Sequence, residues 1–131
     1  MTTSPPSSRA ELDAGPVQGL DDERARIVKL GVRAPSGRPR EVIVLLDDDG
    51  LPRAFENLCK HLPVPLDGAS GDVLSDDGRH LLCGTHGALY RFADGYCVSG
   101  PCEGDQLDAH DVEIVDGRVK VRLRPLENER F

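Results

Sequence analysis

The sequence predicts a small all-β protein, with an antiparallel sandwich or barrel as its base and a loop-rich segment inserted into it. Runs rich in valine, isoleucine and leucine alternate with clusters of glycine, proline and aspartate, as strands alternate with turns. No stretch has a convincing helical period. The 131 residues are enough for one compact domain with a modest core.

The first 22 residues differ in composition from the rest. Through Gly19 they are rich in serine, proline, glycine and alanine and contain few branched apolar residues. This composition is typical of segments that bury too little apolar surface to fold. We therefore expect a flexible N-terminal arm over residues 1–22, followed by a single domain over residues 23–131.

Two strands are predicted next, over residues 26–32 and 42–46, because both runs are apolar and rich in β-branched residues. Ala34-Pro35-Ser36-Gly37 interrupts the pattern between them. The segment Asp47-Asp48-Asp49-Gly50 has the residues of a turn rather than of a cation site. Residues 51–55 are therefore expected to return as a third strand, in a hairpin with the second.

A stronger hairpin signal lies near the C-terminus. The dipeptide Asp116-Gly117, which favours a tight turn, separates residues 112–115 from residues 119–123. In the second of these runs, valine and leucine alternate with lysine and arginine. The alternation predicts a strand with one buried face and one solvated face.

The segment between the hairpins, about residues 57–104, is dense in glycine, proline and aspartate and carries two short motifs. Cys59-Lys60-His61 comes first and Cys83-Gly84-Thr85-His86 comes second. Two thiolates and two imidazoles from separate loops form a ligand set for a metal centre carried on the β base. A structural zinc site is the alternative, although zinc modules more often pair Cys with Cys and His with His at short spacing.

Charge and composition limit the possible partners. The formal net charge of −7 argues against nucleic acid or an anionic membrane as partner, and it favours a basic protein. No apolar run is long enough to span a membrane and no secretory signal is recognisable, so we expect a cytoplasmic protein. In that compartment the four cysteines are expected to be metal ligands or buried thiols.

With these motifs, residues 42–123 resemble the Rieske iron–sulfur family, in its ferredoxin type. The resemblance implies a Rieske-like β base with a cluster-binding subdomain over about residues 57–104. It extends beyond the two ligand motifs to an apolar residue in the first loop, a glycine after the second histidine, a turn and a proline loop. These are Leu66, Gly87, Asp94-Gly95 and Ser99-Gly100-Pro101.

The resemblance implies a [2Fe–2S] cluster, with Cys59 and Cys83 on one iron and His61 and His86 on the other. Two ferric ions, two sulfides and two thiolates sum to zero charge, whereas four thiolates would leave a charge of −2. A neutral cluster accepts an electron more easily. Rieske centres accordingly have potentials of about −150 to +300 mV, against about −400 mV for plant-type ferredoxins.

Three further residues are expected next to the ligands. Gly87 directly follows the second histidine, and Pro101 would shield the cluster. Tyr90 is a candidate donor of a hydrogen bond to a ligand sulfur, which would raise the potential. Packing in the core is the alternative role for Tyr90.

Two departures narrow the type of protein that the chain resembles. Higher-potential members of the family have a serine where this chain has Ala88. They also join their ligand loops by a disulfide, whose partners would fall at Val64 and Thr85 here. The chain is therefore expected to resemble the ferredoxins, with a low to intermediate potential.

The remaining cysteines and histidines are expected to be structural. Cys97 and Cys102 are interpreted as buried thiols rather than a second redox pair, because no further cysteine or histidine nearby completes a site. His80 and His110 are expected at the surface.

The function implied by the resemblance is electron transfer, without a catalytic site of its own. The chain would take one electron from a flavin-dependent reductase and pass it to a terminal oxygenase or a similar redox enzyme. Two alternatives are a small subunit of a larger, nitrite-reductase-like oxidoreductase and a zinc-stabilised interaction module. No nucleic-acid or membrane partner is expected.

Overall fold

A computed structural model describes residues 11–20, 25–33, 39–59, 65–68, 73–85 and 87–124. Within these ranges the chain forms nine strands and one short 3-10 turn, η2, at Val17–Gly19. No helix in them is long and apolar enough to cross a membrane. The strands are β1 Glu11–Pro16, β2 Ala25–Arg33, β3 Pro39–Leu46, β4 Pro52–Glu56, β5 His80–Leu82, β6 Leu89–Arg91, β7 Cys97–Ser99, β8 Ala109–Val115 and β9 Arg118–Arg122.

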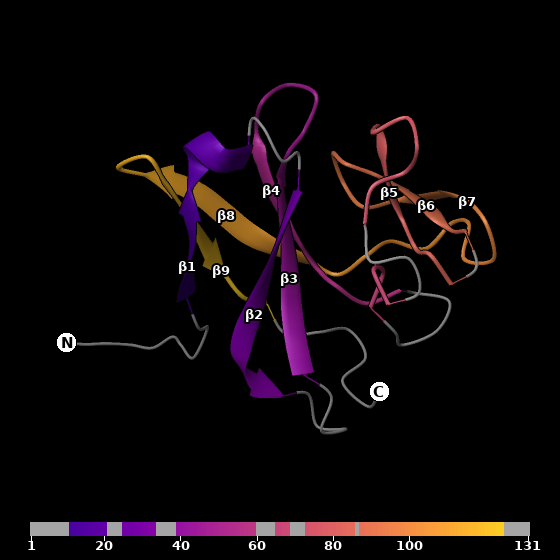
Figure 1. The fold of residues 1–131 in the computed structure, drawn as a ribbon, viewed down its shortest axis with the longest axis horizontal. Helices are drawn as coiled ribbons and strands as arrows, with labels where there is room; N and C mark the ends of the chain where they lie inside the picture. Colours follow the sequence, from indigo (N-terminus) through magenta and orange to yellow (C-terminus); the bar gives the residue numbers. More distant parts are fainter. Residues whose placement is uncertain are drawn as a thin grey trace.

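The strands form two antiparallel sheets. The larger has the order β1-β9-β8-β4-β3-β2, and the smaller has the order β5-β6-β7. Figure 1 shows the small sheet beside the large one, reached through the loops that follow β4 and that lead into β8. The predicted all-β class is confirmed, and β5, β6 and β7 all fall between residues 57 and 104.

Strand β3 contributes to two separate cores, one on each of its faces. Val42 and Val44 pack in a cluster with β9, whereas Ile43 and Leu45 pack in a cluster with the small sheet. All four side chains are fully buried. Since successive side chains of a strand point to opposite faces, only an unbroken apolar run can serve both cores. This explains why residues 42–46 do not alternate.

Both predicted hairpins are confirmed. The β3–β4 turn depends on Asp47, whose Oδ1 accepts the N–H groups of Asp49 at 2.9 Å and Leu51 at 3.0 Å. Burial alone would raise the pKa of Asp47, but these bonds and the one from Arg53 lower it. The β8–β9 turn has positive φ at both Asp116 and Gly117, as a tight type I′ hairpin requires.

The N-terminal arm is corrected for residues 11–20. Residues 11–16 form β1, which pairs with β9, and both Ala14 and Leu20 are buried in the core beside it. The strand is an edge strand that contains Gly15 and Pro16, so composition alone predicted a flexible segment. Residues 1–10 and 21–22 of the expected arm lie outside the described residues.

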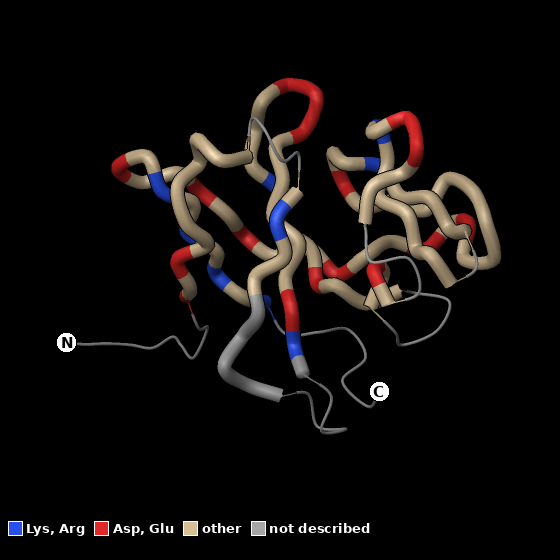
Figure 2. Tube along the Cα trace, in the orientation of Figure 1, with Lys and Arg blue, Asp and Glu red and all other residues tan. Residues whose placement is uncertain are grey.

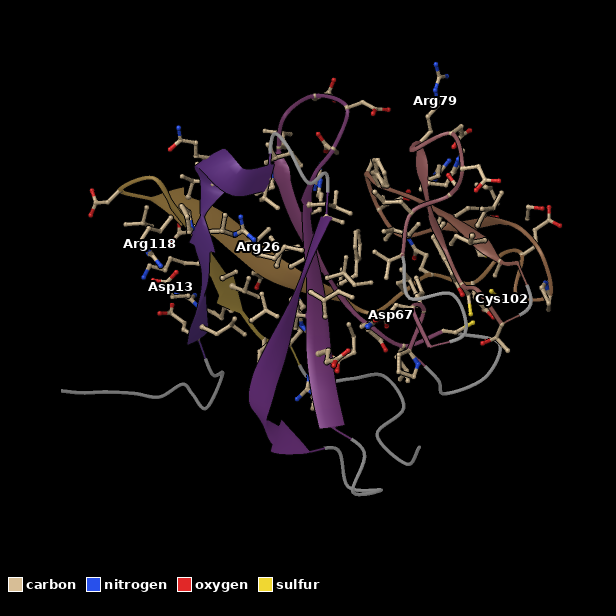
Figure 3. All side chains as sticks on the ribbon, viewed as in Figure 1. Asp13, Arg26, Asp67, Arg79, Cys102 and Arg118 are labelled. Atoms are coloured by element: carbon tan, nitrogen blue, oxygen red, sulfur yellow. The ribbon has the colours of Figure 1, made fainter. Side chains whose placement is uncertain are left out.

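The two edge strands of the large sheet, β1 and β2, are joined by one side chain. Arg26 on β2 donates to the carbonyl oxygens of Ala14 at 2.7 Å and Pro16 at 3.0 Å. Figure 3 shows this side chain reaching from β2 toward β1. The sheet is thereby nearly closed, because the arginine satisfies β1 carbonyls that have no neighbouring strand.

Arg26→Ala is expected to lower the free energy of unfolding by about 1.5–3 kcal/mol, since it removes charged hydrogen bonds to two β1 carbonyls. Denaturant titration measures the loss. Arg122→Ala is the matched control, because Arg122 also contacts β1 but through an exposed pair with Glu11. That variant should differ from wild type by less than about 0.5 kcal/mol. Equal losses in the two variants would contradict the closing role of Arg26.

Candidate metal centre

The two candidate thiol ligands follow strands that lead into the region between the sheets. Cys59 comes shortly after β4, and Cys83 directly follows β5. Both are buried in the apolar cluster that β3 shares with the small sheet. His61 and His86 lie outside the described residues, within which no three metal-binding side chains gather. The structure therefore places the two cysteines of the predicted ligand set in one buried cluster, and the ligand set itself stays a prediction.

The first ligand loop is anchored by Asn57, which sequence reasoning missed. Its Oδ1 accepts the N–H of Leu66 at 2.8 Å, and its Nδ2 donates to Glu41 and Asp67, each at 3.0 Å. The Asn57 N–H also donates to the Glu41 carbonyl at 2.9 Å. One buried amide thus ties both ends of the Cys59 loop to β3. The sequence did offer one signal for this role, because Asn57 is a polar residue between a predicted strand and the candidate ligand Cys59.

The two ligand loops are joined through the backbone of Leu66. The N–H of Gly84 donates to the Leu66 carbonyl at 3.0 Å, while the Leu66 N–H donates to Asn57. The predicted apolar residue of the first loop is fully buried at this junction. Thr85, one of the two positions at which the higher-potential proteins would have their inter-loop disulfide, is exposed. A hydrogen bond therefore joins the loops in a chain that has no cysteine at either disulfide position.

A tight turn closes the second ligand loop. The Gly87 N–H donates to the Cys83 carbonyl at 2.8 Å, and the Cys83 N–H donates to the Ala88 carbonyl at 2.9 Å. Gly87 has a φ of 77°, and a Cβ there would meet nothing within 4 Å. Glycine is thus needed for the backbone conformation rather than for space.

The proline loop packs against the second ligand loop. Gly100 has a φ of 107°, and a Cβ there would lie 2.7 Å from the Ala88 Cα. Only glycine allows this approach. Pro101 is exposed, and its role as a shield stays a prediction.

Tyr90 on β6 connects one candidate ligand to a further cysteine. Its side chain is fully buried, with its Oη 3.4 Å from Cys59 Sγ and 3.0 Å from Cys102 Sγ. The contact with Cys59 agrees with the expected hydrogen bond to a ligand sulfur. The effect on a bound cluster stays a prediction.

Cys97 and Cys102 are buried free thiols, as expected. Their sulfur atoms lie 3.1 Å apart, and Cys97 Sγ donates to the Ser99 carbonyl at 3.3 Å. Burial raises the pKa of the Cys102 thiol to about 12, although the hydrogen bond with Tyr90 opposes the shift. Cys102 is therefore a protonated thiol at neutral pH.

A buried polar network lies directly before the first ligand loop. Glu56, at the end of β4, accepts two hydrogen bonds from Arg40, at 2.8 and 3.0 Å, and contacts His110 Nε2 at 2.9 Å. His110 Nδ1 accepts the Arg124 N–H at 2.9 Å, so the ring proton is on Nε2 and donates to Glu56. The expectation that His110 lies at the surface is wrong, because it fills the buried position that completes this network.

Burial would raise the pKa of Glu56, but the hydrogen bonds from His110 and Arg40 keep it below the ordinary value of 4.5. A lowered pKa means that ionised Glu56 stabilises the fold above about pH 4.5, and that this stability is lost as the pH falls toward the pKa in the fold.

Glu56→Gln should therefore lower the free energy of unfolding by about 3 kcal/mol at pH 7, because it leaves Arg40 without its carboxylate. The variant should also lose part of the acid dependence below pH 4.5.

Denaturant titrations at pH 7 and pH 4 measure both effects. Asp111→Asn is the control, since its ion pair with Arg124 is exposed and is worth at most about 1 kcal/mol. A Glu56→Gln variant whose stability decreases with acid as steeply as that of wild type would show that Glu56 does not carry the pH dependence.

Asn57→Ala should destabilise the fold by about 2–4 kcal/mol, because it leaves the buried Leu66 N–H without its acceptor. Hydrogen exchange at Leu66 and Gly84 should accelerate with it. Thr85→Ala, on the exposed part of the second loop, is the control and should change stability by less than about 0.5 kcal/mol. Unchanged exchange at both amides in Asn57→Ala would refute the anchoring role.

Comparison with protein-family models gives a match to the Rieske [2Fe-2S] domain over residues 14–120. A sequence search of curated proteins gives no match.

Three solved structures share the fold. The Sphingomonas yanoikuyae B1 ferredoxin is 23% identical with a TM-score of 0.64, and the match covers 88% of this chain and 100% of that one. A chain from the complex of reduced oxygenase and oxidised ferredoxin in carbazole 1,9a-dioxygenase is 24% identical with a TM-score of 0.65, over 89% of this chain and 97% of that one. The terminal oxygenase of carbazole 1,9a-dioxygenase from Novosphingobium sp. KA1 is 22% identical with a TM-score of 0.63, over 89% of this chain. This chain spans only 30% of that oxygenase.

Proposed function

This chain belongs to the Rieske [2Fe–2S] domain family, and on that premise we propose that it is a one-electron carrier. We assign Cys59 and Cys83 to one iron of the family's cluster, and His61 and His86 to the other. When bound, the cluster takes up and returns a single electron without a change of ligands. The role requires no catalytic site of its own.

The observation that supports the proposal is the convergence of two thiols from separate loops. Cys59 is 4% exposed and Cys83 is fully buried, and both lie in one apolar cluster. Two cysteine sulfurs from separate loops are the protein ligands that a Rieske-type cluster needs on one of its irons, so this pair fits the family's cluster. The Leu66–Gly84 hydrogen bond holds the two loops together for it.

The partners that we propose are a flavin-dependent reductase as donor and a terminal oxygenase or similar enzyme as acceptor. The fold matches nearly whole ferredoxin-sized chains, but only 30% of the oxygenase chain named above. Acidic residues, shown in red in Figure 2, gather at several loop tips of a chain with net charge −7. A surface of this kind favours a basic docking partner. Reduced thiols and this partner class fit the cytoplasm.

The carrier function can be tested with the isolated protein and two purified components of a carbazole-type dioxygenase system, its reductase and its oxygenase. The reductase with NADH should reduce the chain by one electron, and the oxygenase should reoxidise it, followed by absorbance in stopped flow. The alternative is a subunit of a larger enzyme. In that case the reductase would still reduce the chain, neither this nor another oxygenase would reoxidise it, and the chain would purify with the larger enzyme at fixed stoichiometry.

His86→Cys is expected to lower the midpoint potential, because a thiolate adds one negative charge where a neutral imidazole stood. Protein-film voltammetry measures the shift. His80→Cys makes the same substitution on β5, outside the ligand set, and should leave the potential unchanged. An unchanged potential in a cluster-containing His86→Cys variant would rule out His86 as a ligand.

A further inference from the structure

We propose that the Cys102 thiol competes with Cys59 for the hydrogen of the Tyr90 hydroxyl, and so holds the potential of the centre below the value that Tyr90 would otherwise give it. The inference rests on the proposed function, because it requires Cys59 to be a ligand of the cluster. It gives a role to a cysteine that the ligand set leaves unused.

The Tyr90 hydroxyl lies between two sulfurs and is closer to that of Cys102. Tyr90 Oη is 3.0 Å from Cys102 Sγ and 3.4 Å from Cys59 Sγ, and all three residues are buried. A phenol has one hydrogen, so a stronger bond to one sulfur weakens the bond to the other. The acceptor strength of Cys102 therefore affects the hydrogen bond that Cys59 receives.

The hydrogen of Cys102 is already used on its other side. Cys102 Sγ donates to Cys97 Sγ at 3.1 Å, and Cys97 Sγ donates to the Ser99 carbonyl at 3.3 Å. Since a thiol has one hydrogen, Cys102 accepts from Tyr90. The hydrogens of Tyr90 and of the two thiols thus all point toward the Ser99 carbonyl, in a series that we call the thiol relay.

The pKa of Cys102 agrees with these directions. Burial is the main cause that raises this pKa to about 12, so Cys102 keeps its hydrogen at neutral pH. The bond with Cys97 also raises the pKa, as it does where a thiol donates, whereas the bond with Tyr90 lowers it, as it does where the sulfur accepts. A thiol that donates on one side becomes a better acceptor on the other, which strengthens its bond from Tyr90.

The loop that carries Cys102 is held by its backbone. The Cys97 N–H donates to the Asp105 carbonyl at 2.7 Å, and the Gly104 N–H donates to the Cys97 carbonyl at 3.1 Å. The Asp105 N–H donates to the Cys102 carbonyl at 2.9 Å. These bonds fix the loop to β7, which pairs with the β6 strand that carries Tyr90. Figure 3 shows Cys102 in this part of the molecule, beside further sulfur atoms.

A weaker hydrogen bond at a ligand sulfur makes the cluster harder to reduce. The added electron increases the negative charge on the sulfurs, so a donated hydrogen bond is stronger in the reduced state and raises the potential. Because Cys102 takes part of the Tyr90 hydrogen, Cys59 receives less of this stabilisation. The effect has the same sign as that of Ala88, which stands where higher-potential proteins have a serine.

The test is a double-mutant cycle on the cluster-containing protein, measured as midpoint potential by protein-film voltammetry. Cys102→Ala should raise the potential, because Cys59 is then the one of the two sulfurs that remains to accept from Tyr90. The same substitution in a Tyr90→Phe background should leave the potential unchanged, since Cys102 acts through the Tyr90 hydroxyl. No rise in Cys102→Ala, or an equal rise in the Tyr90→Phe background, would overturn the inference.

Two further substitutions of Cys102 separate its role as an acceptor from its role in packing. Cys102→Val fills the space without offering an acceptor and should also raise the potential, so the prediction can be tested even if Cys102→Ala fails to fold. Cys102→Ser keeps a hydroxyl that can accept from Tyr90, so its potential should lie closer to that of wild type. Equal rises in the serine and valine variants would overturn the inference.

Ser99→Ala is the matched control on β7, because it removes an exposed hydroxyl but keeps the carbonyl that accepts from Cys97. Its potential should equal that of wild type, and a rise as large as that of Cys102→Ala would overturn the inference. Thiol counting on the wild-type holoprotein should find Cys97 and Cys102 reduced, and a disulfide between them would overturn it too.

The EPR signal of the reduced wild-type protein distinguishes failure of this inference from failure of the proposed function. If wild type lacks the signal of a reduced cluster, the proposed function fails together with this inference. A wild-type signal with an unshifted Cys102→Ala potential rejects the inference alone.

Discussion

The candidate centre depends on the two hydrogen bonds made by the backbone of Leu66. Its N–H donates to the Asn57 side chain and its carbonyl accepts the Gly84 N–H, so one residue connects β4, the first ligand loop and the second. These two hydrogen bonds connect the loops that carry Cys59 and Cys83, which also share one apolar cluster. Both groups of the peptide are used within the protein, as a buried peptide requires.

Strand β3 connects these hydrogen bonds to the large sheet. Because both of its faces are buried, β3 belongs to the core of the base and also to the core shared with the small sheet. Glu41 on the same strand receives the Asn57 amide, and the buried Arg40–Glu56–His110 network fixes the end of β4 beside it. These hydrogen bonds hold the ends of β3 and β4 at the start of the first ligand loop, as a preorganised metal site requires.

The features that could be predicted from the sequence are those with a local signal. Apolar runs and turn residues predicted β2, β3, β4 and the β8–β9 hairpin, and the Cys/His motifs pointed to Cys59 and Cys83, which the structure buries in one apolar cluster. The missed features depend on partners distant in sequence. Strand β1 is defined by pairing with β9, Asn57 by Leu66 and by Glu41, and the burial of His110 by Glu56. Composition and periodicity carry no information on such pairings.

The central claim is that this chain holds a [2Fe–2S] cluster with two sulfur and two nitrogen protein ligands. Iron and acid-labile sulfide analysis, with EPR of the dithionite-reduced protein, tests it most directly. The account predicts two irons and two sulfides per chain and an EPR signal with hyperfine coupling to histidine nitrogens. A colourless protein with one zinc, no acid-labile sulfide and no EPR signal after reduction would contradict it.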